Sequence, residues 1–326
     1  MKMNGTILII IISLSVLLAV CVIAAETVLY LTSNGHANLD FVIKASRKSD
    51  LEKLRDKLCE EAMEWLGSQD TKEYQIRSKD GLLLKALYIP APETEEQNTE
   101  QKNSDCGKRM AFCIHGIQSN GLREFAPAAK YFYDHGIGSF IVDQRACGKS
   151  EGKYVTYGAK EADDCEQWLN YIAEEFGQDM RVFVYGMSMG SAVTVLLGGR
   201  KLPANVEYLV SDCGYASVKN QMLHTFGSLN MPRNLLYRLY KCACICHRIY
   251  NPEKVYITQA AEKCNLPILF IHGDKDEVVS VENVYELYKI CGSKNKKIIV
   301  TEGAGHVHSF IVSEEVRKAV WTWNEL

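Results

Sequence analysis

Short apolar runs that alternate with amphipathic segments are the feature of this sequence that most restricts its fold. The runs carry few charges, as expected of strands that are covered on both faces, and most are separated by segments with helical spacing of apolar residues. This alternation predicts an α/β fold, with a mainly parallel central sheet and helices on both of its faces. The segments 73–78 and 82–89, joined at Asp80-Gly81, are expected to form an opening hairpin. The other expected strands are 110–114, 139–142, 182–185, 208–210, 268–271 and 298–300, and the expected helices are 124–135, 159–176, 191–200, 281–291 and 309–323.

Two connections depart from this regular pattern. The polar and acidic stretch 93–107 has no periodicity and is expected to be a surface loop between two strands. The stretch 216–262 is far longer than an ordinary connection. Its apolar residues recur at helical spacing, so we expect a helical cap that covers a pocket or faces lipid. The same residues could also be plain core.

An uncharged apolar run occupies the N-terminal part of the chain. Gly5 to Ala25 comprises 21 residues without a charge, which suffices at 1.5 Å per residue to cross a hydrocarbon layer of roughly 30 Å. The alternatives are a cleaved signal peptide, for which Ile23-Ala24-Ala25 is a passable site, and a lipoprotein signal ending at Cys21. The length of the run favours an uncleaved single-pass membrane anchor.

The chain therefore divides into an anchor at 1–31, a linker at 32–72 and an α/β domain at 73–326. Residues 44–69 have helical spacing of apolar residues with charges on the other faces, which predicts an amphipathic helix without chemistry of its own. No candidate catalytic residue precedes the α/β domain. A chain that begins near Glu73 is accordingly expected to be soluble and active.

Charge and cysteine usage restrict the compartment and the partners. The net charge is −3 and no basic stripe stands out, so a nucleic-acid partner is not expected. Lys44, Arg47 and Lys48 follow the apolar run, which favours a cytoplasmic α/β domain by the positive-inside rule. Twelve scattered cysteines favour a reducing compartment. The tightest group, 242–246, lacks the second pair of a zinc site and is interpreted as a buried helix with small thiols.

The sequence GMSMG follows the predicted strand 182–185 and precedes a predicted helix. It is a G-x-S-x-G motif in the strand–turn–helix context that a nucleophile elbow requires. Larger side chains at Gly186 and Gly190 would collide in so sharp a turn. Ser188 is thereby raised above the sheet, where the amide of Met189 points at the oxygen of an attacked carbonyl.

A serine nucleophile needs a base and an orienting acid, which in this architecture follow in the order acid, then histidine. Asp274 and Asp276 both follow the strand 268–271, and spacing alone does not separate them. Asp212, after the strand 208–210, is a third candidate that we interpret as structural.

The candidate base follows the strand 298–300. His306 is flanked by small residues and is preferred over His308. At another strand end, His115-Gly116 follows the strand 110–114. We interpret His115 as an orienting hydrogen-bond donor, and the amide of Ile117 as the second oxyanion donor.

Jointly these motifs resemble those of serine hydrolases with the α/β-hydrolase fold. The chain is similar to membrane-anchored bacterial members near the serine aminopeptidase (S33) and monoacylglycerol lipase group, over about 73–326. The matching segments are His115-Gly116, DQRACGKSEG at 143–152, GMSMG at 186–190, HGDKD at 272–276 and Gly305-His306.

The resemblance implies a catalytic triad of Ser188, Asp276 and His306, because the family pattern H-G-x-x-D places the acid at Asp276. It also implies a variable cap, which matches 216–262. Cys147 stands where relatives often have histidine, a departure without catalytic consequence. The family includes esterases, lipases and thioesterases, so its name does not establish a peptidase.

The expected reaction is acyl transfer to water, with a small-molecule acyl substrate and no metal or organic cofactor. The leading function is hydrolysis of a carboxylic ester. The alternatives are an aminopeptidase of the proline iminopeptidase type and a membrane-anchored binding protein without turnover. Glu253 is the only acid in 216–256, which offers little to hold a substrate amine.

Overall fold

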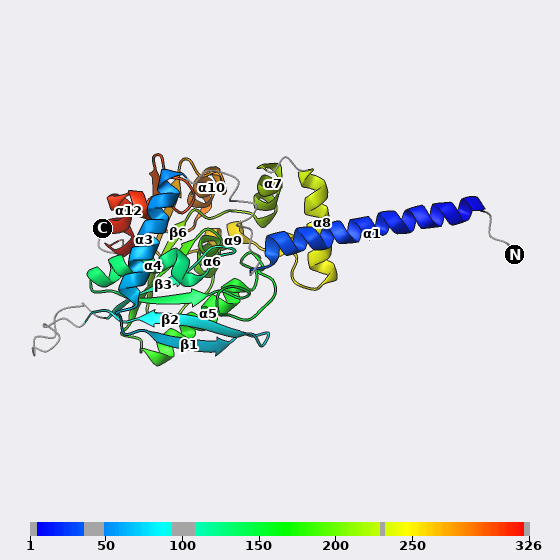
Figure 1. Cartoon of the computed structure of the whole chain (residues 1–326). Coiled ribbons are helices and arrows are strands. Elements are labelled where there is room, and N and C mark those ends of the chain that lie inside the picture. Colours follow the sequence, from blue (N-terminus) through cyan, green and yellow to red (C-terminus); the bar gives the residue numbers. More distant parts are fainter. Residues whose placement is uncertain (1–4, 36–48, 93–107, 229–231, 323–326) are drawn as a thin grey trace, which may run out of the picture.

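One twisted sheet organises the α/β part of the chain (Figure 1). The computed structural model describes residues 5–35, 49–92, 108–228 and 232–322. The strands are β1 (Lys72–Arg77), β2 (Leu83–Ile89), β3 (Arg109–Ile114), β4 (Gly138–Asp143), β5 (Arg181–Met187), β6 (Val206–Asp212), β7 (Ile268–Gly273) and β8 (Lys296–Thr301). Their order across the sheet is β1-β2-β4-β3-β5-β6-β7-β8. Only β2 runs against its neighbours β1 and β4, so the sheet is mainly parallel, as predicted.

Helices lie in each connection from β3 to β8, and others precede β1 or follow β8. They are α1 (Gly5–Ser33), α3 (Asp50–Leu66), α4 (Gly121–Asp134), α5 (Glu161–Glu175), α6 (Met189–Gly198), α7 (Val218–Ser228), α8 (Arg233–Cys246), the short 3-10 helix η2 (Pro252–Lys254), α9 (Ile257–Lys263), α10 (Glu282–Ile290), α11 (Ser309–Val312) and α12 (Glu314–Thr322). The sequence predicts one helix over 309–323. The structure divides this segment at Ser313, where extended backbone separates α11 from α12.

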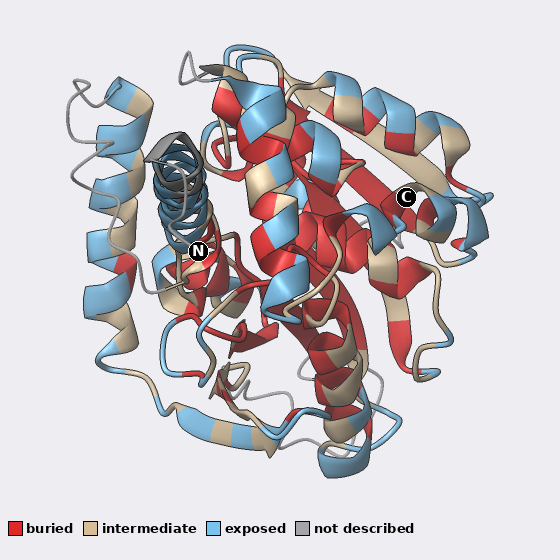
Figure 2. Cartoon of the chain, turned by 90° about the vertical axis from the view of Figure 1, so that its right-hand side faces the viewer, coloured by how far each residue is buried: buried red, intermediate tan, exposed pale blue. Residues whose placement is uncertain are grey.

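Two apolar layers cover the two faces of the sheet, whose central strands β4, β3, β5, β6 and β7 are buried along almost their whole length (Figure 2). Trp168 of α5 and Val193 of α6 belong to one layer, together with Phe112 of β3. Phe132 of α4 and Val320 of α12 belong to the other. Neighbouring residues of a strand point to opposite faces, so a strand between two layers needs apolar residues at nearly every position. This requirement explains the continuous apolar runs of the sequence.

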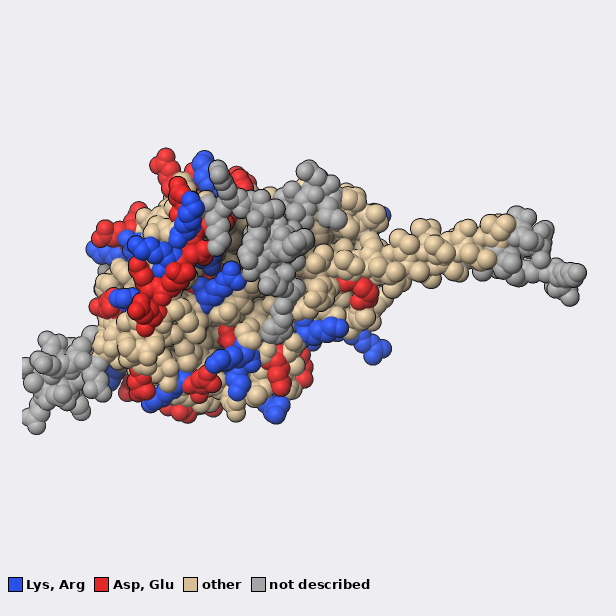
Figure 3. Space-filling model, viewed as in Figure 1, with Lys and Arg blue, Asp and Glu red and all other residues tan. Residues whose placement is uncertain are grey.

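The N-terminal helix α1 projects far out of the domain (Figure 1). Its residues Ile12–Ser33 are long and apolar enough to cross a membrane, and little of this stretch is buried. In the view of Figure 3 its projecting part shows no charged side chain, whereas charges are spread over the surface of the domain. The carboxyl end of α1 differs, because Val28 and Leu29 are buried against the domain.

The predicted cap is helical and consists of α7, α8, η2 and the start of α9. Helix α8 contacts both α7 and α1. Of its cysteines, Cys244 is buried as predicted. Cys242 and Cys246 are exposed instead, because residues four apart share one face of a helix and this face points away from the core.

Two further expectations fall partly or wholly on residues outside the described ranges. The predicted surface loop 93–107 lies entirely outside them. The predicted amphipathic helix 44–69 is present as α3, which begins at Asp50 behind a capping box formed by Ser49 and Glu52.

Candidate active site

Ser188 lies in a sharp turn between β5 and α6, at the carboxyl edge of the sheet. Its backbone has φ 55° and ψ −117°, which a residue with a side chain rarely adopts. Both flanking glycines are required by close approach. A Cβ atom on Gly186 would lie 2.1 Å from the carbonyl oxygen of Gly190, and one on Gly190 would lie 1.9 Å from that of Ile114. The collision expected from the sequence is therefore present on both sides of the turn.

The histidine and the acid come from loops that follow the two strands β8 and β7. Nε2 of His306 lies 2.9 Å from Oγ of Ser188, and Nδ1 of His306 lies 2.7 Å from Oδ2 of Asp276. In this arrangement the Ser188 hydroxyl donates to Nε2, and the Nδ1–H group donates to the carboxylate. The three side chains thus form a continuous chain of hydrogen bonds, which is the geometry of a catalytic triad.

Asp276 is buried and accepts hydrogen bonds on both of its oxygens. Oδ1 accepts from the backbone N–H groups of Val278 and Val279, at 2.9 and 2.8 Å. Oδ2 faces His306 and also lies 3.2 Å from Nε2 of His272. Burial disfavours the charged carboxylate, but the hydrogen bonds outweigh it and hold the pKa of Asp276 well below its ordinary value. Asp276 is therefore ionised at neutral pH.

The other two candidate acids have different partners. Oδ1 of Asp274 accepts from the backbone N–H of Gly303 at 2.6 Å, so this side chain ties one loop to the next. Asp212 is fully buried and accepts from the hydroxyl of Tyr185 at 3.0 Å. Burial raises the pKa of Asp212 to about 6. Neither side chain hydrogen-bonds to His306 in the described part of the chain.

The remaining histidines near the site do not reach Ser188. His308 is buried, and its ring nitrogens have no hydrogen-bond partner among the described residues. Nδ1 of His115 donates to the Gly116 carbonyl oxygen at 2.6 Å, while Nε2 accepts from the backbone N–H of Gln144 at 3.0 Å. Burial lowers the pKa of His115, which keeps its ring neutral in this bridging position. Its role in orienting the loop after β3 agrees with the interpretation from the sequence.

The loop after β3 begins next to Ser188, because a Cβ atom on Gly116 would lie 3.1 Å from Cβ of Ser188. Neither the amide of Ile117 nor that of Met189 donates to any group in the described part of the chain. The neighbouring amide of Gly116 is occupied, because it donates to Oε2 of Glu124 at 2.5 Å. Two amides on either side of a nucleophile are the usual components of an oxyanion hole.

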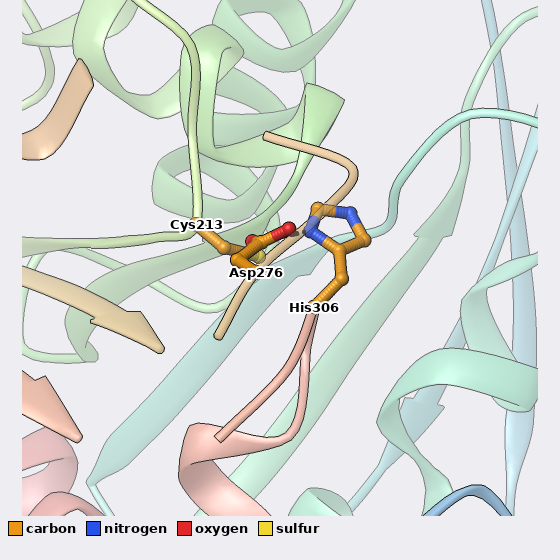
Figure 4. A group of neighbouring side chains, drawn as sticks. All are labelled: Cys213, Asp276 and His306. Carbon is orange, nitrogen blue, oxygen red and sulfur yellow. Dashed lines mark hydrogen bonds and ion pairs between the residues drawn. The ribbon is translucent and has the colours of Figure 1, made fainter. Parts of the chain in front are cut away.

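The side chains of Cys213, Asp276 and His306 lie close together (Figure 4), with their possible ligand atoms within 4.8 Å of one another. A metal would require the thiolate of Cys213. Burial, with the charges of Asp212 and Asp276, raises the pKa of this thiol well above its ordinary value. The carboxylate and both ring nitrogens already have partners. The group therefore fits the serine arrangement better than a metal site.

A cavity of about 260 Å³ opens in front of Ser188. This volume is just below the usual range for small-molecule sites. Its walls are mainly apolar and come from the cap, the loop after β3 and, unexpectedly, α1. The sequence places nothing before residue 73 in the site, whereas Val28, Leu31 and Thr32 line this cavity. An apolar run carries no signal that separates these pocket residues from the rest of the helix.

The sequence also gives no signal for the partners that hold the acid and the loop. His272 lies within the HGDKD segment, but nothing in the pattern shows that its ring contacts Asp276. Gln118 follows Ile117 at a positive φ of 53° and lines the cavity. Its side chain donates to the carbonyl oxygen of Leu31 at 2.8 Å, which links the loop after β3 to α1.

The family model for Serine aminopeptidase, S33 matches residues 107–244 and 254–310. These two segments contain Ser188, Asp276, His306 and both amides of the candidate oxyanion hole. The chain belongs to this family. It is a hydrolase of the α/β-hydrolase type, as the motifs indicated.

Several curated proteins resemble the chain at low identity. The protein YqkD of Bacillus subtilis is 24% identical over 200 residues, which cover 60% of this chain and 64% of that protein. The protein bem46 of Schizosaccharomyces pombe is 27% identical and covers 71% of this chain and 69% of its own. The membrane protein YNL320W of Saccharomyces cerevisiae is 26% identical, with 52% and 54% covered. The match thus spans somewhat less than two thirds of the Bacillus protein and about half of the budding-yeast protein.

Solved structures agree with the fold. An esterase of Pyrococcus furiosus, Pf2001, superposes with a TM-score of 0.62 at 23% identity, over 79% of this chain and 91% of that one. Est1E of Butyrivibrio proteoclasticus, solved with ferulic acid, gives a TM-score of 0.55 at 18% identity, over 77% and 98%. These likenesses establish the α/β-hydrolase fold of the chain.

Proposed function

We propose that this hydrolase cleaves a carboxylic ester through a Ser188–His306–Asp276 triad and an acyl-enzyme intermediate. The observation that carries the proposal is the chain of two hydrogen bonds, 2.9 and 2.7 Å long, that joins the three side chains above the carboxyl edge of the sheet. Pf2001 of Pyrococcus furiosus, one of the solved structures described above, bears the name of an esterase, which is consistent with the same reaction class.

The geometry supports an ordinary two-stage mechanism. Ser188 attacks the acyl carbonyl while His306 takes its proton, and the amides of Ile117 and Met189 stabilise the oxyanion. His306 then gives the proton to the leaving alcohol. In the second stage His306 activates water, which releases the acid and restores Ser188. Asp276 keeps the proton of the neutral imidazole on Nδ1 and stabilises the imidazolium that forms in each stage.

The lining of the pocket favours an ester over an aminoacyl amide. An aminopeptidase needs a carboxylate that binds the ammonium group of its substrate. Among the described residues that line the cavity, none is acidic. Glu253 of the cap is instead engaged with Lys241 on the surface. An apolar acyl group suits such walls better than an amine.

The decisive experiment is a screen of the full-length protein in detergent. Acyl esters of increasing chain length are compared with aminoacyl amides, alongside labelling of Ser188 by a small fluorophosphonate. We expect labelling and ester turnover, both absent in Ser188→Ala. Turnover of aminoacyl amides alone would favour the peptidase. An unlabelled, inactive parent chain would favour a binding protein without turnover.

We further propose that α1 is an uncleaved anchor and that the domain lies on the cytoplasmic side. The described cysteines are all free, which fits a reducing compartment. The basic residues at 44–48 fit the same side. The protein should remain in the membrane pellet after carbonate extraction and retain its N-terminus. Soluble protein with an intact N-terminus would contradict the anchor, and protease access from outside intact cells would contradict the orientation.

A further inference from the structure

The last two turns of α1 are built into the domain, unlike the rest of that helix. Leu29 and Ser33 are fully buried, whereas Val22 and Ile23 are more than half exposed. The Ser33 hydroxyl lies 3.1 Å from the hydroxyl of Tyr240 in α8. A helix end that is buried this way has a fixed rotation, so each of its side chains has a defined direction.

The final carbonyl groups of α1 are bound by the domain. The last four C=O groups of a helix lack partners within the helix and must find them elsewhere. Three of them find partners in two separate loops of the domain. The hydrogen bonds run from Gln118 Nε2 to Leu31 O at 2.8 Å, from the Tyr157 hydroxyl to Thr32 O at 2.5 Å, and from Val155 N to Ser33 O at 2.8 Å.

The side chains of this helix end face the cavity that contains Ser188. Val28, Leu31 and Thr32 line it together with residues of the cap. Val28 is buried, at 9% exposure, and so forms part of the inner wall of the cavity. Leu31 is 40% exposed, and Val278, which also lines the cavity, is 52% exposed. Two pocket residues that remain this accessible mark an apolar mouth next to the membrane helix.

We propose that the end of α1 is one wall of the acyl site, and that Val28 and Leu31 determine which acyl chains it accepts. The inference rests on the proposed role of Ser188, because it assigns the cavity to the acyl group of the substrate. It makes the membrane helix a part of the substrate site as well as an anchor. A bulkier side chain at either position takes volume from a cavity of about 260 Å³ and shortens the acyl chain that fits.

Matched substitutions in the full-length protein in detergent test this role. Val28→Trp narrows the cavity, whereas Val22→Trp places the same side chain on the exposed part of the same helix. The values of kcat/KM are measured for nitrophenyl esters from acetate to dodecanoate. We expect Val28→Trp to lower the dodecanoate-to-acetate ratio by about ten-fold or more, the scale on which hydrophobic pockets discriminate. Leu31→Trp should act in the same direction, and Val22→Trp should keep the parental ratio.

The results of these measurements distinguish a failure of the proposed role of α1 from a failure of the proposed ester hydrolysis. One outcome is that Ser188 is labelled by the fluorophosphonate while Val28→Trp and Val22→Trp give equal dodecanoate-to-acetate ratios. This outcome would contradict the proposed role of α1 in the acyl site and would leave the proposed triad unaffected. Failure of the parent chain to label or to turn over esters would overturn both. Should Val28→Trp lower the melting temperature strongly, Val28→Ala gives the opposite test. A larger cavity must then shift the ratio towards longer chains, and an unchanged ratio in Val28→Ala counts against the wall.

Discussion

At the carboxyl edge of the sheet each proposed catalytic group follows directly after a strand, whereas the wall that faces them comes from α1, α7 and α8. Ser188 follows β5, Asp276 follows β7 and His306 follows β8. Parallel strands end at one edge, so the fold itself brings these loops together. The facing wall depends on helices that are distant in the chain and meet only by packing. If the proposed function holds, the reaction depends on groups that local strand ends place, and the acyl preference depends on tertiary contacts between helices.

The largest expected effect is the loss of turnover on substitution of Ser188 or His306, without loss of binding in the pocket. Ser188→Ala and His306→Ala should each lower kcat by roughly a million-fold, and the double variant should be hardly worse, since the residues act as a unit. Binding of a non-reactive ester analogue should persist in Ser188→Ala, because the pocket walls are unchanged. Turnover and equilibrium binding of the analogue measure the two effects. Loss of analogue binding in Ser188→Ala would mean that reaction and pocket are not separable.

Asp276→Asn tests which of the two acids after β7 orients the imidazole of His306. It should lower kcat by about 10⁴, because an amide favours the wrong tautomer of the imidazole. Asp274→Asn is the matched control two residues away, and it should cost far less because its side chain binds the amide of Gly303. Turnover is measured together with melting temperatures, so that unfolding is not taken for lost chemistry. Near-normal turnover in Asp276→Asn with a large loss in Asp274→Asn would reassign the acid.

The strand ends were predictable from sequence for a physical reason. A nucleophile elbow needs glycines where Cβ atoms would collide, and these collisions appear at Gly186 and Gly190. Strands buried on both faces need continuous apolar runs, and short apolar runs marked β3 to β8. The less buried β1 and β2 were expected instead from the hairpin turn at Asp80-Gly81. Local backbone geometry and burial each require particular residue types, which can be recognised in the sequence. The fold and the placement of Ser188 after β5 were predicted from these patterns.

The pocket wall was not predictable in this way. An apolar residue that faces lipid and one that faces a substrate pocket satisfy the same pattern, so Val22 and Val28 cannot be told apart in the sequence. Spacing alone left Asp274 and Asp276 equivalent, and only the resemblance to a family separated them. The contact of His272 with Asp276 depends on how one loop turns back on itself. Three-dimensional packing determines which of these residues line the pocket and which contact Asp276.

A moderate effect is expected from adjacent residues of α8. Leu236 lines the cavity, whereas Leu235 is 56% exposed on the same helix. Leu236→Ala enlarges the pocket and should raise the relative kcat/KM for long or branched acyl esters by about ten-fold. Leu235→Ala should leave this profile unchanged. The rate of labelling by a small fluorophosphonate should be similar in both variants. Equal loss of labelling and of turnover in Leu236→Ala would mean that α8 is a structural support of Ser188.

The smallest expected effect concerns a carboxyl group at the same sheet edge that lies outside the triad. The pKa of Asp212 is raised by burial to about 6 in the folded chain, above its ordinary value of 3.8. The folded state therefore holds a proton more tightly than the unfolded state does. This contribution to the free energy of unfolding is fully present below about pH 4 and is lost as the pH rises through about 6.

Asp212→Asn removes the titrating group and keeps an acceptor for the hydroxyl of Tyr185. The melting temperature of the parent chain should therefore fall relative to that of Asp212→Asn between pH 4 and pH 7. The corresponding change in the free energy of unfolding is roughly 3 kcal/mol, from a pKa difference of about two units. Turnover should be retained, because the Asp212 carboxylate accepts its hydrogen bond from Tyr185 and none from His306 in the described part of the chain. A parallel pH dependence in both proteins would show that Asp212 stays charged in the fold, and a loss of turnover near that of Asp276→Asn would place it in the reaction.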